Sequence, residues 1–498
     1  MNGRGRHYSG YWWTAAVFAV TAPLLLTLAR VLWHTPYPIS ETIALLEDVD
    51  TSPASFFLDP ARKSWYRPLY HLTWMALWRG TGSLDAALVL FKTIEVAAVG
   101  GLIALLIWHL RPRTAIAAGA ATFAVAVLVG TPGFRDNLEL PLIYTTVGMP
   151  LLLIVWMLLE RKERWWHTPV ILALTLLAIG YKEQGLVIVP VVLVAWWMGA
   201  PGASRTTAAA IVVMTAVYLA IRFSTSGSWP TFVQDVGYGF TMLSPDQATA
   251  RFGTFPVGMY VYNVVVTTTN ILFSEPTAGV FTIVRDVRDG RVAAWELNHV
   301  MSSAVLTVLI VWWGVGALRA NPKAQIPNPK SKRVGIWSLG FGFWDFVRRT
   351  PWSVESRVFA ATVIAVAASA ALGFNYTRDR LGGMAAVFYA LAAYHAIRTV
   401  AEHLVHAPRS LVLSTGVVLA LLAGAWQLRA IGTVEYARLT AFKDRREWMT
   451  DLQQRRVEFA RRAAYLRILN AMTDQGTTSS VPRPTALPDW AGSIIGGG

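Results

Sequence analysis

Cysteine is absent from this chain of 498 residues, which excludes disulfide bonds and metal sites built on thiolates. Charge is also scarce, because 15% of the residues are charged while 54% are hydrophobic. That balance argues against a soluble protein of this length. The nine histidines show no metal-ligand spacing such as His-x-x-x-His. The sequence therefore defines no metal site, and the only cofactor that stays open is a divalent cation.

The charge that is present is mostly positive, with a formal net value of +15. In a soluble protein this excess would indicate a nucleic-acid partner. Here the lysines and arginines gather between apolar runs, where such residues set helix orientation and contact anionic lipid headgroups. We therefore expect the lipid bilayer as a partner and no nucleic acid.

Apolar runs dominate what the chain does contain. Runs of about 20 apolar residues are typical of transmembrane helices, because the hydrocarbon core of a bilayer is about 30 Å thick. The first run, 11–33, is too long for the core of a cleaved signal peptide and has no small-residue cleavage site after it. We predict an all-α integral membrane protein, a polytopic bundle of about 11 transmembrane helices. The predicted spans are 12–33, 85–110, 114–130, 139–159, 168–181, 185–199, 206–223, 299–318, 357–373, 381–400 and 410–428.

The positions of lysine and arginine near helix ends place the N-terminus in the cytoplasm. This predicts a multi-pass protein of the inner (cytoplasmic) membrane. The segments that then face outside are 34–66, 131–138, 182–183, 224–298 and 375–380.

Two regions follow from composition. Residues 1–430 form the predicted transmembrane domain, and 431–498 form an amphipathic helical tail with a disordered end. Within the first region lie an external loop with its following segment, 34–84, a long external loop, 224–298, and a low-complexity cytoplasmic insertion, 319–356.

The first external loop is rich in carboxylates: Glu41, Glu47, Asp48, Asp50 and Asp59. A hydroxyl acceptor has a very high pKa and needs a positioned carboxylate to take its proton in the transition state. The alternative is a solvated acidic loop. An apolar stripe at 43–46 favours a helix lying at the membrane interface, and Tyr-Arg-Pro-Leu at 66–69 places an arginine beside the carboxylates.

On these residues the chain resembles the GT-C superfamily of polytopic membrane glycosyltransferases. The resemblance is nearest to the transmembrane and tetratricopeptide-repeat O-mannosyltransferases and their bacterial relatives. Those proteins carry a pair of acids in this loop, where this chain has Ser40 and Glu41. The resemblance implies that Glu41 is the catalytic base and that Arg67 belongs to the substrate-binding group.

A second motif, 131–141, separates the third and fourth predicted spans. The family pattern has His-Pro followed by an acid, where this chain has Thr131, Pro132 and then Asp136. The resemblance implies that Asp136 binds the acceptor or a metal ion. The alternative is helix capping by Asp136 and Asn137, since both residue types favour the N-cap.

A third motif, Lys182-Glu183-Gln184-Gly185, interrupts two apolar stretches. The resemblance implies that Lys182 pairs with the lipid phosphate as a point charge and that Glu183 orients it or contacts the sugar. The alternative is an ordinary helix–helix turn at Gly185.

A fourth motif, 374–384, contains Arg378 and Arg380. Guanidinium groups bind phosphate bidentately, and a departing polyprenyl phosphate needs that stabilisation. The alternative is anchoring at the membrane surface. Gly382 and Gly383 would allow a lipid or a backbone segment to approach closely.

Together these motifs imply transfer of a hexose from a polyprenyl-phosphate donor to a hydroxyl of a glycan, lipid or protein acceptor outside the membrane. The alternatives are a transporter or flippase, and an inactive relative that acts as a scaffold in assembly of cell-envelope glycans.

Overall fold

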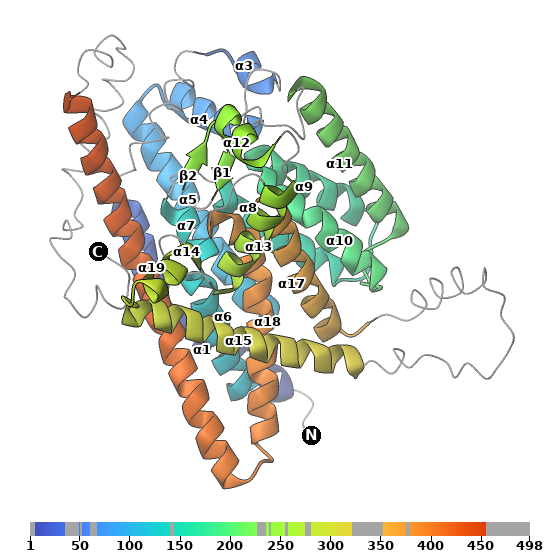
Figure 1. The fold of residues 1–498 in the computed structure, drawn as a ribbon. Coiled ribbons are helices and arrows are strands. Elements are labelled where there is room, and N and C mark those ends of the chain that lie inside the picture. Colours follow the sequence, from blue (N-terminus) through green and yellow to red (C-terminus); the bar gives the residue numbers. More distant parts are fainter. Residues whose placement is uncertain are drawn as a thin grey trace, which may run out of the picture.

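The computed structural model describes residues 5–34, 49, 52–59, 67–139, 144–226, 236–238, 241–253, 257–273, 280–320, 352–374 and 379–454. The regular structure of these residues is helical apart from one ribbon of two short antiparallel strands, in which Val236 pairs with Leu243 and Tyr238 with Thr241 (Figure 1). In the N-terminal half the elements are α1 (Gly5–His34), α3 (Ala54–Leu58), α4 (Pro68–Thr81), α5 (Leu84–Leu110), α6 (Ala115–Gly130), α7 (Pro132–Glu139), α8 (Tyr144–Leu159), α9 (His167–Tyr181), η1 (Glu183–Val187), α10 (Ile188–Trp197) and α11 (Arg205–Ser226). In the C-terminal half they are β1 (Val236–Tyr238), β2 (Thr241–Leu243), α12 (Pro245–Phe252), α13 (Val257–Phe273), α14 (Val280–Arg288), α15 (Ala294–Arg319), α17 (Val354–Ala371), η2 (Asp379–Gly382), α18 (Gly383–Leu404) and α19 (Arg409–Gln454).

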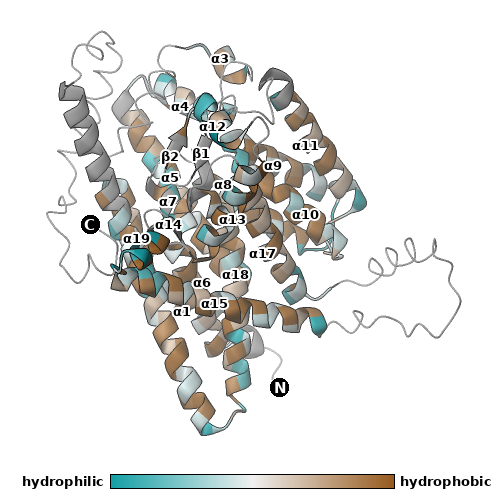
Figure 2. Ribbon diagram, in the orientation of Figure 1, coloured by the Kyte–Doolittle hydropathy of each residue, from teal (hydrophilic) through white to brown (hydrophobic). Residues whose placement is uncertain are grey.

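Seven helices of the described chain are long and apolar enough to cross a membrane: α1, α5, α11, α15, α17, α18 and α19. They coincide with seven of the predicted spans, and hydrophobic residues predominate along their ribbons where these are coloured (Figure 2). The other four predicted spans correspond to α6, α8, α9 and the η1–α10 segment, which are shorter apolar helices. A helix of 16 residues reaches about 24 Å, less than the hydrocarbon thickness of about 30 Å. Length and composition therefore support seven spans and do not establish eleven.

The centre of the bundle is built on α6 and α18. Both helices are rich in alanine, and α6 is buried from Phe123 to Gly130. Small side chains allow helix backbones to approach closely. In a membrane the hydrophobic effect does not drive helices together, so close van der Waals packing of this kind holds them in contact. In this way α6 packs against α18 on one side and α19 on another.

The C-terminal part differs from the prediction of a span at 410–428 followed by separate surface helices. It is one helix, α19, of 46 residues, which runs along the edge of the bundle (Figure 1). At 1.5 Å per residue it is about 69 Å long. No proline follows Arg429 before Gln454, so nothing in the sequence breaks the helix when its composition turns from apolar to charged.

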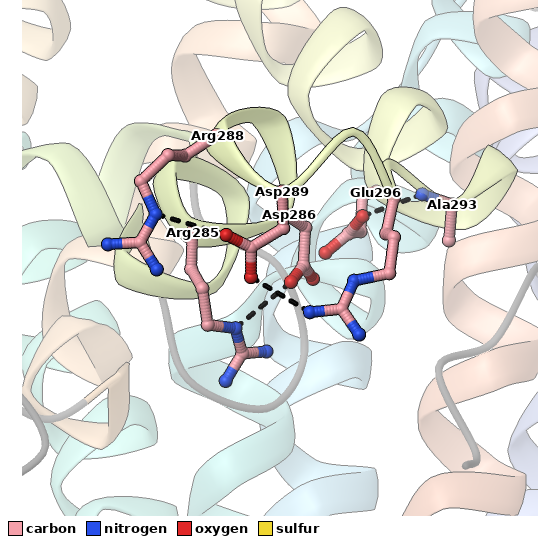
Figure 3. A network of polar contacts seen from close by, with 7 residues as sticks. Arg285, Asp286, Arg288, Asp289, Ala293 and Glu296 are labelled. Atoms are coloured by element: carbon pink, nitrogen blue, oxygen red, sulfur yellow. Dashed lines mark hydrogen bonds and ion pairs between the residues drawn. The ribbon is translucent and has the colours of Figure 1, made fainter.

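The predicted long loop 224–298 contains regular structure: β1, β2, α12, α13, α14 and the start of α15. Helix α13 is itself a short apolar helix. The turn from α14 to α15 carries ion pairs within hydrogen-bond distance, Arg285 with Asp286 and Asp289 with both Arg288 and Arg291 (Figure 3). The Glu296 carboxylate accepts a hydrogen bond from the backbone N–H of Ala293 and so begins α15. The turn between α14 and α15 is thus cross-linked by ion pairs between its own side chains.

Two other predicted features lie largely outside the described residues. The apolar stripe 43–46 is one of them, and the insertion 319–356 is described only at its two ends. Close to the end of that insertion, Arg357 of α17 forms a bidentate ion pair with Glu160 at the end of α8, at 2.9 and 2.5 Å. The sequence had placed both chain positions on the cytoplasmic side, and the structure brings them together.

Candidate functional site

An ion pair joins the Tyr-Arg-Pro-Leu motif to the Lys-Glu-Gln-Gly motif. Arg67 immediately precedes α4, and Pro68 begins that helix. The Arg67 guanidinium donates from Nε to one Glu183 oxygen at 3.1 Å and from Nη2 to the other at 3.0 Å. The two residues are 116 positions apart in the chain, and this parallel fork is the geometry in which guanidinium and carboxylate bind most specifically.

The backbone at Lys182 and Gly185 aims Glu183 toward Arg67. Helix α9 ends at Tyr181, Lys182 is extended, and η1 begins at Glu183. A Cβ on Gly185 would lie 2.4 Å from the backbone of Ala178 and Ile179, so the turn after α9 folds back too tightly for any side chain. The structure therefore contains the helix–helix turn that the alternative reading expected, and that turn presents the charged pair.

Two more contacts hold α4 against α9. The Leu69 side chain occupies the space next to Gly180, where an added Cβ would lie 2.5 Å from its Cδ1 atom. One turn later, the Thr73 hydroxyl is 2.7 Å from the Tyr181 hydroxyl. Arg67 thus lies at the end of an interface in which α4 contacts the last turn of α9, and its side chain reaches Glu183 at the start of η1.

The start of α4 is also packed on the part of the first external loop that the structure describes. The His71 ring stacks on Phe57 of α3 with ring centroids 5.0 Å apart, and its Nδ1 atom lies 2.7 Å from the Arg67 carbonyl oxygen. Trp74 stacks on Phe91 of α5 at 3.9 Å. These aromatic contacts fix the position of Arg67 relative to α3 and α5.

Glu183 is ionised at neutral pH despite its surroundings. Burial of the carboxyl favours the neutral form, but the charges of Arg67 and Lys182 and the hydrogen bonds from Arg67 outweigh that penalty and lower the pKa of Glu183 to about 2. A carboxylate with so low a pKa is a poor proton acceptor. Glu183 therefore suits an orienting or sugar-binding role. Lys182 beside it is buried, with 3% of its surface exposed.

This ion pair gives a testable pH dependence. The folded-state pKa of Glu183 lies below the value of about 4.3 expected in an unfolded chain. The pair therefore stabilises the fold above pH about 4.3, and that contribution is lost as the pH falls toward 2. We expect the thermal midpoint of the detergent-solubilised protein to exceed that of Glu183→Gln at pH 7, and the difference to shrink steadily below pH 4.5.

The matched control for that titration is Glu402→Gln, which removes the exposed Arg398–Glu402 pair of α18. Exposed pairs of this kind contribute little to stability. A difference between wild type and Glu183→Gln that stays constant down to pH 2 would contradict the ionised pair.

The second and fourth motifs meet in space. Gly133 in the first turn of α7 lies against the η2–α18 junction, where a Cβ would be 2.5 Å from the Gly382 carbonyl carbon and 2.8 Å from the Gly383 nitrogen. The expectation that Gly382 and Gly383 allow close approach is confirmed for a backbone segment, and that segment is the second motif.

The expected capping role of Asp136 and Asn137 is wrong. Both residues lie inside α7, which begins at Pro132, a residue suited to the first helical position. The Thr131 hydroxyl instead accepts a hydrogen bond from the Phe134 N–H at 3.4 Å. The Asn137 amide donates to the Gly133 carbonyl within the helix. The side chain of Asp136 lies outside the described part, so its acceptor- or metal-binding role stays a prediction.

Three of the four motifs converge on two helices. Both η1, which carries Glu183, and η2, which follows the arginine motif, pack against α17 and α18, and α7 contacts η2 and α18. Glu41 and Arg378 lie outside the described residues, and Arg380 is placed in η2 without a described side chain. The structure thus brings together Arg67, Lys182 and Glu183, and it also brings the backbones of the second and fourth motifs into contact with each other.

One buried arginine was missed by sequence reasoning. Arg429 of α19 has 3% of its surface exposed and inserts between α6 and α15. The last predicted span, 410–428, ends just before it. The buried residues Leu422, Trp426, Arg429 and Thr433 recur at helical spacing, so the packed stripe of α19 continues through the arginine. That periodicity was the available signal.

No group of three or more His, Asp or Glu residues that could hold a metal ion occurs in the part of the chain that the structure describes. No family model, no curated protein and no solved structure matches this chain. The likeness to the GT-C superfamily therefore rests on the motifs themselves.

Proposed function

We propose that the protein is a membrane glycosyltransferase that moves a hexose from a polyprenyl-phosphate donor to an acceptor hydroxyl on the outer face of the membrane. The observation that carries this proposal is the bidentate pair between Arg67 and Glu183, at 3.0 and 3.1 Å. It ties the segment that follows the acidic loop to the Lys-Glu motif, as a shared site requires.

In the proposed reaction Glu41 takes the proton of the acceptor hydroxyl as the oxygen attacks the anomeric carbon. The bond from that carbon to the phosphate oxygen breaks, and the polyprenyl phosphate leaves with the electron pair. One such displacement inverts the anomeric centre. Lys182 and Arg378 or Arg380 stabilise the phosphate charge, and Arg67 holds Glu183 in place toward the sugar.

The division of labour between the two glutamates follows from their surroundings. Glu183 is bracketed by two cations, which lower its pKa to about 2 and leave it a poor base. The base must come from another carboxylate, and the acidic loop before α4 supplies Glu41. We assign Asp136 to binding of the acceptor or of a divalent cation.

The test is hexose release from radiolabelled polyprenyl-phosphate hexoses in liposomes, with wild type, Glu41→Gln and the surface control Arg398→Gln side by side. We expect release by wild type and by Arg398→Gln, and none above background by Glu41→Gln. Absence of release with every donor, in protein shown to be folded, would favour a transporter, a flippase or an inactive scaffold.

A further inference from the structure

Arg429 is held in an unusual environment for a buried cation. Its Nε donates to the Gly130 carbonyl at 3.2 Å, and its Nη1 lies 3.1 Å from the His299 carbonyl, 3.0 Å from the Ser302 hydroxyl and 2.7 Å from the Ser303 hydroxyl. All four of these acceptors are neutral. The charge is thus solvated by dipoles, whereas the buried Arg357 has a carboxylate partner.

Donor groups at this position remain unused. Among the described residues, the Nη2 atom of Arg429, the Nε1 atom of Trp426 and the Nδ2 atom of Asn298 are buried without a hydrogen-bond partner. The Arg429 guanidinium stacks 3.8 Å from the Trp426 ring, so two of these donors belong to one stacked unit. Asn298 adjoins His299, whose carbonyl accepts from the same guanidinium. Buried donors without acceptors are costly, and their grouping here points to an acceptor that is bound in another state.

A second cation lies near the first. Arg135 of α7 is buried, and its guanidinium lies 4.6 Å from the ring of Tyr436, which is about two turns after Arg429 in α19. Arg135 is also close enough to Arg429 for the two positive charges to repel each other. Two guanidinium groups and unused N–H donors on facing helices form an environment for an anion that accepts several hydrogen bonds.

The level of the cluster in the membrane indicates which anion. Arg429 lies 20 residues after Arg409, the start of α19. Twenty residues of helix span about 30 Å, the thickness of the hydrocarbon core. The end of α6 at Gly130 and the first turns of α15 lie at this same level because both contact Arg429. A helix that enters the hydrocarbon core at Arg409 therefore brings Arg429 to the level of the lipid phosphates on the opposite side.

We propose that Arg429, together with Trp426 and Asn298, forms a binding site for the phosphate group of a membrane lipid, with Arg135 adding positive charge from α7. The phosphate oxygens accept hydrogen bonds from Nη2, the indole N–H and the amide. Side chains that cover these atoms move aside when the ligand binds, since each donor atom is fully covered in this structure. The site does not depend on glycosyl transfer.

The test measures binding to the full-length protein in detergent micelles by ligand-dependent thermal stabilisation. The probes are phosphatidic acid, the matching diacylglycerol and inorganic phosphate, because polyprenyl phosphate would also bind the proposed glycosyl-transfer site. We expect stabilisation by phosphatidic acid and none by diacylglycerol. Inorganic phosphate that stabilises as well as the lipid at equal concentration would overturn the lipid as the ligand.

Three variants make the binding test specific. Arg429→Gln is expected to weaken phosphatidic acid binding at least tenfold, while Arg398→Gln, which alters an exposed arginine of α18, leaves it unchanged. Trp426→Phe keeps an aromatic ring and removes the indole N–H together with part of the bicyclic ring, so it remains informative if Arg429→Gln does not fold. We expect a threefold or greater loss of affinity.

Equal affinity in wild type, Trp426→Phe and any folded Arg429 variant would overturn the proposal. Binding can fail in these variants while wild-type hexose release persists, and release can be absent while binding is intact. The two proposals are therefore distinguishable.

Discussion

Substitution of Glu41 by glutamine lowers the rate of hexose transfer by about 10²- to 10⁴-fold, the usual contribution of a general base. Glutamine keeps nearly the same size and removes both the charge and the ability to accept the proton of the acceptor hydroxyl. Glu183 cannot replace Glu41 in this role, because Arg67 and Lys182 lower the pKa of Glu183 to about 2 and make it a poor proton acceptor. The measurement is the initial rate of radiolabelled hexose transfer in liposomes under saturating donor.

Glu47→Gln is the matched control, because it makes the same chemical change six residues later in the same acidic segment. We expect it to retain at least half of the wild-type rate. Comparable losses in both variants would mean that the acidic segment acts through its overall charge. A Glu41→Gln protein within tenfold of wild type would show that another group takes the proton.

The long helices were predictable because their signal is local. An apolar run of sufficient length predicts a membrane helix wherever its partners lie, and α1, α5, α11, α15, α17, α18 and α19 all follow predicted runs. The shorter helices α6, α8 and α9 have the same composition, so hydropathy alone could not separate them from full spans. Hydropathy does not predict that α19 is continuous, because it registers the change from apolar to charged residues, whereas a helix ends only where its backbone hydrogen bonds stop.

The candidate site was predictable in part for a related reason. The turn at Gly185 and the close approach at Gly382 depend on glycine, which has no side chain to obstruct them. The positions of these glycines can be read from the sequence. Arg67 and Glu183 are 116 residues apart in the chain, and neither the Tyr-Arg-Pro-Leu motif nor the Lys-Glu-Gln-Gly motif indicates which residue its charged side chain contacts. The environment of Arg429 depends on Gly130, His299, Ser302 and Ser303, which come together only when α6, α15 and α19 pack.

Substitution of Gly133 by alanine destabilises the fold by about 1–3 kcal/mol, the range typical of an overpacked core. The new Cβ would lie 2.5 Å from the Gly382 carbonyl carbon and 2.8 Å from its oxygen. These neighbours are backbone atoms, so no side-chain rotation relieves the contact and α7 must move away from η2 and α18. The measurement is the thermal midpoint of the purified protein in detergent.

Gly119→Ala is the matched control for this effect. Gly119 lies within α6 and has no atom within 4 Å of an added Cβ. Alanine is favoured over glycine in a helix by up to about 1 kcal/mol, so this variant is expected to be as stable as wild type or more stable. Both substitutions carry that same helix-propensity gain, because Gly133 lies in α7. A lower midpoint for Gly133→Ala alone therefore measures the contact with η2. Equal midpoints for the two variants would show that α7 and η2 are not in backbone contact, and the second and fourth motifs would then no longer belong to one site.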